Sequence, residues 1–571
     1  MRNVVNLKAK PYYLSDEDIV WVQRTLAGMT LDEKVGQMFC LVGYSDEEAY
    51  LKRLAADYKA GGLMCRPMPV GDILNTVQTL QQNAKIPMLI AANLEKGGSG
   101  IAVEGTTIGS VMQVAATDDD EMAYKLGVVC GREGAAVGCN WAFAPIVDID
   151  YNFRNPITNT RTFGSDPERV RRMGIQYVKG VQQNGVAASI KHFPGDGVDE
   201  RDQHLVESVN SLSCEEWDAT YGAVYKACIE EGAMTVMVGH ILQPAYSRKL
   251  NPALKDHEIL PASLSYELVT KLLKEQLGFN GLVVTDASTM AGMMISMPRS
   301  QAVPQAIAAG CDMFLFCRSL EEDFGYMKQG IEDGIITGER LNEALTRILG
   351  LKAALKLHRK QAEGTLVPRL EDALKVLGAE EHWQWSVECA DKAVTLVKEE
   401  NGVLPIHPDK YKRVLFYDIE SQQGVAYSAR VGASELFKEM LRAEGFEVST
   451  FEVNPGFEGM MSAQSEVLGQ FDLIIYLANM VTKSNQTVVR IEWKQPMGAN
   501  VPTFMTSIPT MFISIENPYH LLDVPRVKTF INAYNSNDNV LQALIDKLMG
   551  RSEFKGTSPV DAFCGLWDAK L

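Results

Sequence analysis

Eight short apolar runs recur between Gly36 and Cys317, and the segments between them are long enough to hold a helix. The runs do not alternate apolar with polar residues, which is typical of strands covered on both faces. Strands that alternate with helices indicate parallel pairing. The runs are GQMFCLV (from Gly36), GGLM (from Gly61), PMLIAA (from Pro87), AFAPIVD (from Ala142), AASIKH (from Ala187), MTVMVGH (from Met234), GLVVTD (from Gly281) and MFLFC (from Met313).

Eight such repeats predict an α/β fold with a closed (β/α)8 barrel, which we expect over residues 1–355. A doubly wound open sheet is the structural alternative. The barrel is favoured because residues able to do chemistry follow the runs, and active sites of barrels lie at the C-terminal ends of the strands.

The rest of the chain predicts a second, smaller domain. Residues 356–386 are polar and indicate a linker with some helix, and residues 387–571 contain further strand-like runs such as RVLFYDI, DLIIYLA and TMFISI. Helical segments lie between these runs, which favours an α/β sandwich. This domain carries no obvious catalytic cluster, so its expected role is structural or oligomeric. A homodimer is one option.

Composition excludes several classes of function. The formal net charge is −17 and no basic run appears, which argues against nucleic acid as a partner. The N-terminus lacks the apolar core of a signal peptide, and no apolar run approaches the roughly 18 residues that span a bilayer. Ten cysteines are scattered without a CxxC pair. Buried, reduced thiols and a cytoplasmic protein without membrane contact are therefore expected.

The densest polar cluster follows the fifth run, in KHFPGDGVDERDQH from Lys191 to His204. Proline and glycine make this segment a loop. An acidic surface loop is the ordinary explanation of such a cluster. Its place at the C-terminal end of a barrel strand favours an active site instead.

A second candidate, Asp286, ends the seventh run in VVTDA. An Asp after an apolar strand is often a helix N-cap, which is the competing explanation. A carboxylate at a barrel mouth, with a titratable His on another loop, is also what glycoside cleavage requires. One group attacks the anomeric carbon and the other protonates the departing oxygen.

Three motifs in order resemble glycoside hydrolase family 3. KHFPGDGVDERDQH resembles the KHFPG and D-x-H signature of the β-N-acetylglucosaminidases of that family, and VVTDASTM resembles their nucleophile motif. NPITNTRTFGSDPE, from Asn155, is similar to the family's segment after the fourth strand. The resemblance covers the whole barrel, and the second domain is similar to the α/β sandwich of longer members.

The resemblance implies a retaining hydrolase that removes a terminal β-linked N-acetylglucosamine from a carbohydrate. It implies Asp286 as nucleophile and His204 as acid/base, supported by Asp202. It further implies that sugar hydroxyls are bound by Lys191, His192, Arg161 and His240. For His240, which ends the sixth run, a purely structural role is an equal expectation.

An imidazole at position 204 departs from the pair of carboxylates that most glycosidases use. A His is able to give and take a proton near neutral pH, and Asp202, two residues earlier, is placed to fix its tautomer. Asp199 and Glu200 are rival acids in the same loop.

One segment departs from the family pattern. After the third strand the family usually has Asp-x-Glu-Gly-Gly followed by Arg, whereas this chain has Asn93-Leu94-Glu95-Lys96-Gly97 and no Arg nearby. Glu95 is expected to take over a contact with a sugar hydroxyl. The change affects recognition of the substrate rather than the cleavage chemistry.

Other activities remain as alternatives. A β-glucosidase, or a phosphorylase in which phosphate replaces water in the second step, fits the same residues. A metal-dependent barrel hydrolase would use His192, Asp202 and His204 as ligands. A binding protein with a relic barrel ranks lowest, because Asp286 and His204 are both present. Displacement at an anomeric carbon predicts no metal and no cofactor.

Overall fold

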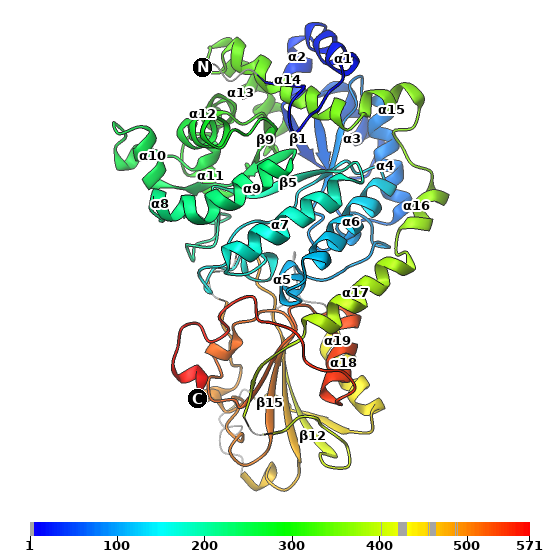
Figure 1. The fold of residues 1–571 in the computed structure, drawn as a ribbon, viewed down its shortest axis with the longest axis vertical. Coiled ribbons are helices and arrows are strands. Elements are labelled where there is room, and N and C mark those ends of the chain that lie inside the picture. Colours follow the sequence, from blue (N-terminus) through cyan, green and yellow to red (C-terminus); the bar gives the residue numbers. More distant parts are fainter. Residues whose placement is uncertain are drawn as a thin grey trace. The chain divides into compact units, whose positions relative to one another are not determined.

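The computed structural model describes residues 5–400, 402–420, 431–454, 456, 464–485, 487 and 489–571 (Figure 1). The chain forms two compact units. The first comprises Met1–Thr107, Ala123–Asn152 and Pro167–Trp383, and the second comprises Ile108–Met122, Phe153–Asp166 and Gln384–Leu571. In the described part of the chain, no helix is long and apolar enough to cross a membrane.

The first unit contains a closed barrel of eight parallel strands, which confirms the predicted fold class. Each apolar run overlaps one strand, and nearly all of the strand residues are buried. The barrel closes where β10 pairs with β1, Phe39 opposite Phe314. The strands are β1 (Phe39–Val42), β2 (Gly62–Met64), β3 (Leu89–Ala92), β4 (Trp141–Ala142), β5 (Ala187–Phe193), β7 (Thr235–Val238), β9 (Leu282–Ala287) and β10 (Met313–Leu315).

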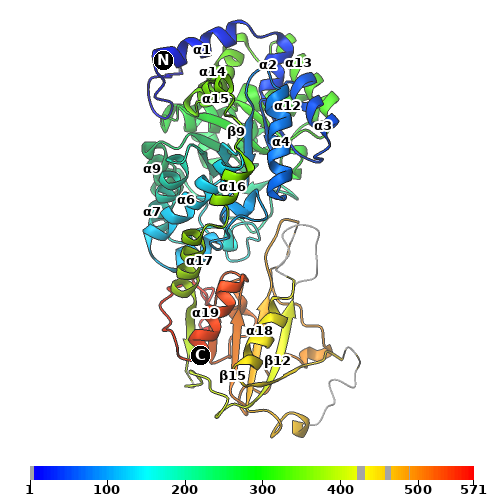
Figure 2. The same ribbon diagram turned by 90° about the vertical axis from the view of Figure 1, so that its right-hand side faces the viewer.

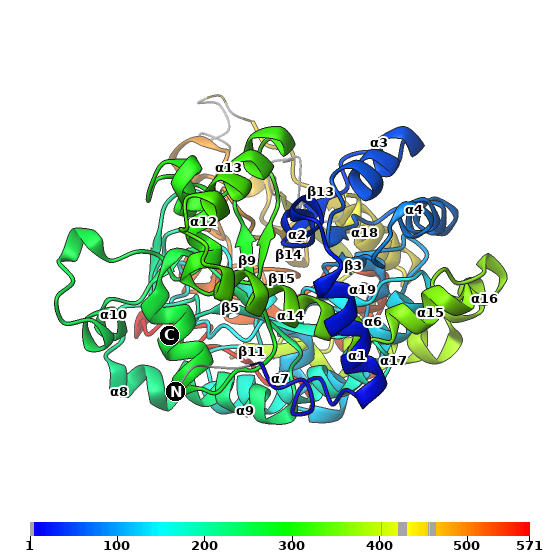
Figure 3. The same cartoon turned by 90° about the horizontal axis from the view of Figure 1, so that it is seen from above.

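Helices surround these strands, as the view from above shows (Figure 3). Their starts follow the local sequence: the Thr30 hydroxyl accepts from the Glu33 amide, and the Glu33 carboxylate accepts from the Thr30 amide. The helices are α1 (Asp16–Ala27), α2 (Leu31–Gln37), α3 (Glu48–Lys52), α4 (Val70–Asn83), α6 (Asp120–Ala136), α7 (Pro167–Gln182), α8 (Cys214–Trp217), α9 (Ala223–Glu231), α10 (Pro244–Leu250), η7 (Glu267–Gln276), α11 (Ala291–Met294), α12 (Arg299–Ala309), α13 (Leu320–Glu332) and α14 (Gly338–Ala354).

The segment expected to be a linker is largely helical. It forms α15 (Leu357–Glu363), α16 (Leu370–Val376) and the start of α17 (Glu380–Ala393). The Glu133 carboxylate on α6 lies 2.7 Å from His382 Nδ1 and accepts from the Gly378 amide at 3.1 Å. These contacts attach the segment to the barrel unit as far as Trp383.

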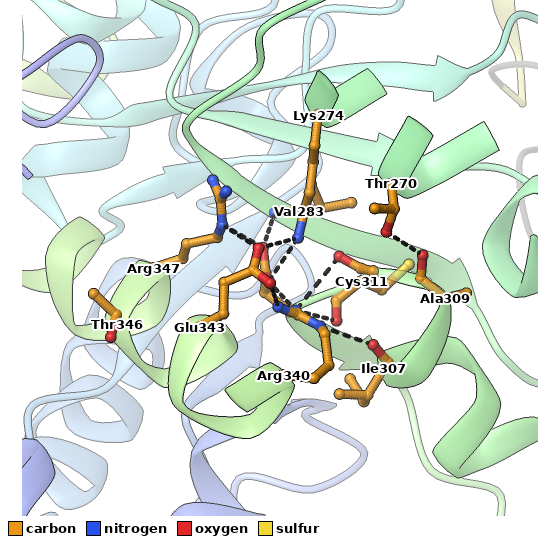
Figure 4. A network of polar contacts seen from close by, with 12 residues as sticks. Thr270, Lys274, Val283, Ile307, Ala309, Cys311, Arg340, Glu343, Thr346 and Arg347 are labelled. Atoms are coloured by element: carbon orange, nitrogen blue, oxygen red, sulfur yellow. Dashed lines mark hydrogen bonds and ion pairs between the residues drawn. The ribbon is translucent and has the colours of Figure 1, made fainter. Parts of the chain in front are cut away.

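A buried ionic network lies at the N-terminal ends of β9 and β10 (Figure 4). Asp312, just before β10, accepts from the Val283 amide at 2.8 Å and pairs with Lys274 at 3.3 Å and with Arg340. Glu343 on α14 pairs with Lys274 at 2.9 Å. Burial raises the pKa of Glu343, but Lys274, and after it Arg340, lower it well below its usual value. Active sites of barrels lie at the C-terminal ends of the strands, so we assign this network a role in the stability of the fold.

The second unit is built on a six-stranded sheet in the order β11-β16-β15-β14-β12-β13, in which β11 alone is antiparallel to its neighbour. Alternate strand residues enter two apolar layers. Val414 and Phe416 pack with the helical layer, and Leu415 and Tyr417 face the opposite layer. The strands are β11 (Thr395–Glu399), β12 (Arg413–Glu420), β13 (Glu447–Thr450), β14 (Leu473–Asn479), β15 (Thr510–Ser514) and β16 (Thr529–Asn532).

Helices α18 (Ala433–Ala443) and α19 (Asp538–Leu548) cover the first of these layers (Figure 2). The expected α/β sandwich is confirmed. Two segments that we assigned to the barrel, residues 108–122 with α5 (Val111–Ala116) and residues 153–166, group with this second unit instead. The Ser110 hydroxyl, for example, donates to the Tyr534 carbonyl at 2.7 Å.

Candidate active site

Most of the predicted site residues lie at the C-terminal ends of barrel strands. Lys191 and His192 end β5, Asp286 lies near the end of β9, Glu95 follows β3, and His240 follows β7. Parallel strands of a barrel present their C-terminal ends on one face, so the topology brings these side chains together.

Asp286 lies beside the imidazole of His192 at this mouth. Its Oδ2 lies 3.9 Å from Nε2 of His192, and its side chain is 14% exposed. Burial acts to raise the pKa of Asp286, but the opposing effect of His192, followed by those of His240 and His204, outweighs it and leaves the pKa below its usual value. Asp286 is therefore ionised at neutral pH, as a nucleophile must be.

A residue that we did not predict, Asp148, holds His192 in place. Its fully buried carboxylate accepts from the His192 amide at 3.0 Å and lies 2.7 Å from His192 Nδ1. It also accepts from the Asp196 amide at 2.8 Å. Nδ1 thus donates to Asp148, and Nε2 faces Asp286. The signal for Asp148 was present, because it ends an apolar run in AFAPIVD just as Asp286 ends another.

His204 and Asp202 form a second pair, on the loop after β5. His204 Nδ1 lies 2.7 Å from Asp202 Oδ1, which also accepts from the His204 amide at 2.8 Å. Asp202 is buried, whereas the His204 side chain is 32% exposed. This arrangement fixes the tautomer and leaves Nε2 of His204 able to exchange a proton.

Main-chain bonds attach the His204 loop to the segment that follows Asp286. The Ala291 amide donates to the His204 carbonyl, and the Gly292 amide donates to the Gln203 carbonyl, both at 3.1 Å. Gly292 suits this approach, because an added Cβ would lie 2.8 Å from the Gln203 carbonyl oxygen. The two catalytic candidates are thus placed by adjoining segments of backbone.

The remaining predicted residues have different surroundings. Lys191 Nζ lies 2.8 Å from Glu95 Oε1, and both side chains are nearly buried. His240 has a partner on each ring nitrogen, Ser263 Oγ at 2.8 Å and the Ala287 carbonyl at 3.0 Å, and burial lowers its pKa. A neutral His240 therefore packs against the backbone of the Asp286 segment.

Arg161 and Asp199 have hydrogen-bond partners of their own. Arg161 lies in η3 (Asn159–Arg161) of the second unit, where its guanidinium donates to the Ile157 carbonyl at 3.4 Å. Asp199, a rival acid, accepts from Arg201 Nε at 2.8 Å and from the Val209 amide at 3.0 Å. These bonds occupy Asp199 within its own loop.

Within the described residues, no group of three or more His, Cys, Asp or Glu side chains is arranged to hold a metal ion. His192, Asp202 and His204, the ligands of the metal-dependent alternative, instead belong to two separate His–Asp pairs.

Known proteins share sequence and fold with this chain. Residues 30–351 match the Glycosyl hydrolase family 3 N terminal domain. A Cellulomonas fimi protein named beta-N-acetylglucosaminidase/beta-glucosidase is 54% identical over 569 residues and covers 100% of both chains. The chain's structure is similar to that of a beta-glucoside phosphorylase, BglX, with 46% identity, a TM-score of 0.93 and 100% coverage of both chains.

It is also similar to a glycoside hydrolase family 3 beta-N-acetylglucosaminidase from Paenibacillus sp. str. FPU-7, with 25% identity and a TM-score of 0.80, over 94% of this chain and 100% of that one. The domain match covers more than half of the sequence, and the full-length relative shares more than half of its residues. The chain belongs to glycoside hydrolase family 3.

Proposed function

We propose that this chain cleaves terminal β-linked N-acetylglucosamine by a retaining, two-step mechanism. The observation that carries the proposal is the backbone pairing that places the His204–Asp202 pair next to the segment of the ionised Asp286. The name of the Cellulomonas fimi relative supports N-acetylglucosamine and adds glucose as a second sugar.

In the first step, Asp286 attacks the anomeric carbon as His204 gives its Nε2 proton to the departing oxygen. The bond from C1 to the aglycone breaks, and an ester between C1 and Asp286 forms. Asp202 stabilises the imidazolium that is present before this transfer and keeps Nδ1 protonated afterwards.

In the second step, the now neutral His204 takes a proton from water, whose oxygen attacks C1 and releases Asp286. Net retention of the β configuration follows from two inversions. Lys191, Glu95 and His192 lie at the C-terminal ends of neighbouring barrel strands, which supports a role for them in binding sugar hydroxyls and orienting the ring over Asp286.

Phosphate as the second-step acceptor is a separate candidate. One observation favours it: the full-length structural relative at 46% identity is titled a beta-glucoside phosphorylase. The electrostatics of the site are compatible with an anion, because Glu95, Asp148 and Asp202 are each paired with a basic side chain. Phosphate dianion also needs no base, so this route would use His204 in the first step only.

The test is a panel of aryl β-N-acetylglucosaminides and β-glucosides assayed with and without phosphate, with the sugar product identified. Free sugar as the product in both buffers supports hydrolysis. Sugar 1-phosphate, with turnover that depends on phosphate, supports the phosphorylase. A protein that cleaves neither glycoside, or that gives the α-configured product of hydrolysis, would refute the retaining mechanism.

Cytoplasmic localisation is part of the proposal and has separate support. All ten cysteines are free thiols, and nine of them are buried. Several unpaired thiols fit a reducing compartment better than an oxidising one. A homodimer stays a prediction.

A further inference from the structure

The loop after β9 is rich in methionine and exposes apolar surface at the barrel mouth. Met290 and Met293 are buried and anchor it, being 5% and 1% exposed. Ile295, just after α11, is 56% exposed, and Met294 is half-buried. Ile295 is therefore an apolar side chain that a ligand at the barrel mouth is able to contact.

This loop lies against the loop of the proposed acid/base. Besides the two main-chain bonds of His204 and Gln203, the Ser296 hydroxyl donates to Glu207 Oε1 at 3.1 Å. Leu205, directly after His204, is 41% exposed. Exposed apolar side chains therefore lie on both of the loops whose backbones pair at His204.

A third loop contributes to the same surface. Arg318, after β10, places Nη1 4.0 Å from the sulfur of Met294. Ser296, a polar group of the methionine-rich loop, is already bonded to Glu207 and to the Gly292 carbonyl at 3.0 Å. Arg318 and Glu207 therefore contact this loop beside its apolar side chains.

We propose that Leu205, Met294 and Ile295 form the subsite for the aglycone, and that this subsite accepts alkyl and aryl groups. The inference rests on the proposed function, because an acid that protonates the glycosidic oxygen must have the departing group on its far side. Side chains that flank His204 on its exposed side are then the first to meet that group.

The chemistry of the side chains specifies the kind of aglycone. Methionine adapts its shape to different apolar partners, so we expect broad tolerance among alkyl and aryl groups. Burial of each methylene contributes a factor of about four in affinity, so an octyl chain that covers this surface gains more than tenfold over methyl.

The experiment compares methyl and octyl β-glycosides of whichever sugar the enzyme cleaves, with phosphate present. The two alcohols are similarly basic, so the ratio of their kcat/KM values reports binding of the chain and not leaving-group chemistry. We expect a ratio above about 10 for the native protein and a fall of at least about fivefold in Ile295→Ser.

Matched variants separate the subsite from general effects. Ile295→Met keeps an apolar side chain and should retain the ratio. Ile335→Ser removes an isoleucine that is 43% exposed between α13 and α14, away from the mouth, and should leave both rates unchanged. If Ile295→Ser does not fold, Leu205→Ser tests the other loop.

The outcomes distinguish the inference from the function on which it rests. Failure of the native protein to cleave any glycoside counts against the proposed function. Cleavage of methyl and octyl glycosides at equal kcat/KM, or a ratio that neither Ile295→Ser nor Leu205→Ser lowers, overturns the aglycone subsite alone.

Discussion

Replacing His192 with asparagine should move the acid limb of the pH–rate profile to higher pH. After burial, which raises the pKa of Asp286, the largest influence is the opposing effect of His192. A nucleophilic carboxylate acts only when ionised, that is, above its pKa. Removing the imidazole that lowers the pKa of Asp286 raises that pKa, so the variant loses activity at a pH where the native protein still works.

The distance sets the magnitude. Two full charges 3.9 Å apart attract by about 4 kcal/mol at an effective dielectric constant of 20, an upper limit of about three pH units. The 14% exposure of the Asp286 side chain adds solvent screening, and His204 remains in the variant. We therefore expect a shift of about one pH unit.

The assay is kcat/KM from about pH 3 to 8 with a dinitrophenyl β-glycoside, whose departure needs little help from a general acid. His257→Asn, which changes an exposed His on the outside of the barrel, is the control and should keep the native profile. An acid limb that stays within about 0.3 pH unit in His192→Asn, or moves to lower pH, would refute the electrostatic account of Asp286.

Four further predictions concern the catalytic groups and the barrel. Asp286→Ala should abolish turnover even of activated aryl glycosides, and a fluorosugar should label Asp286 covalently, as mass spectrometry would show; labelling elsewhere contradicts the assignment. His204→Ala should lose about 10²–10⁴-fold in activity on an alkyl glycoside but much less on a dinitrophenyl glycoside, for which azide should restore turnover. Asp202→Ala should show the same pattern with smaller losses. Equal losses on both substrates and no effect of azide would point to another acid. Asp312→Asn removes one of the two carboxylates that pair with the buried Lys274 and Arg340, and should cost about 3–5 kcal/mol of stability. Calorimetry would measure the loss, and an unchanged melting temperature argues against it. Because the pKa of Glu343 is lowered in the folded state, its ionised form stabilises the fold above about pH 4.5. The stability of the native protein should therefore fall as the pH drops below that value, and the stability of Glu343→Gln should fall less over the same range.

Short-range patterns made the barrel and two catalytic candidates predictable. Each barrel strand is a continuous apolar run because helices and the barrel interior cover it on both faces. Asp286 follows such a run directly, and Asp202 stands two residues before His204, so both relations are visible along the chain.

Long-range relations were not predictable from one sequence. The bond between Asp148 and His192 joins residues 44 apart, and no local spacing indicates it. The segment 153–166, which carries Arg161, groups with the second unit through tertiary packing that the sequence does not express. The edge strand β13 (Glu447–Thr450) was not predicted, because it is mostly exposed and its sequence contains no apolar run.

The pairing of backbone between residues 203–204 and 291–292 has an evolutionary consequence. Main-chain hydrogen bonds do not depend on side-chain identity, apart from the demand for glycine at position 292. Positions 205, 294 and 295 can therefore diverge among descendants of this chain while the spacing between acid and nucleophile is inherited intact. For directed evolution, a library confined to these three positions would sample new leaving groups while keeping the reaction itself constant.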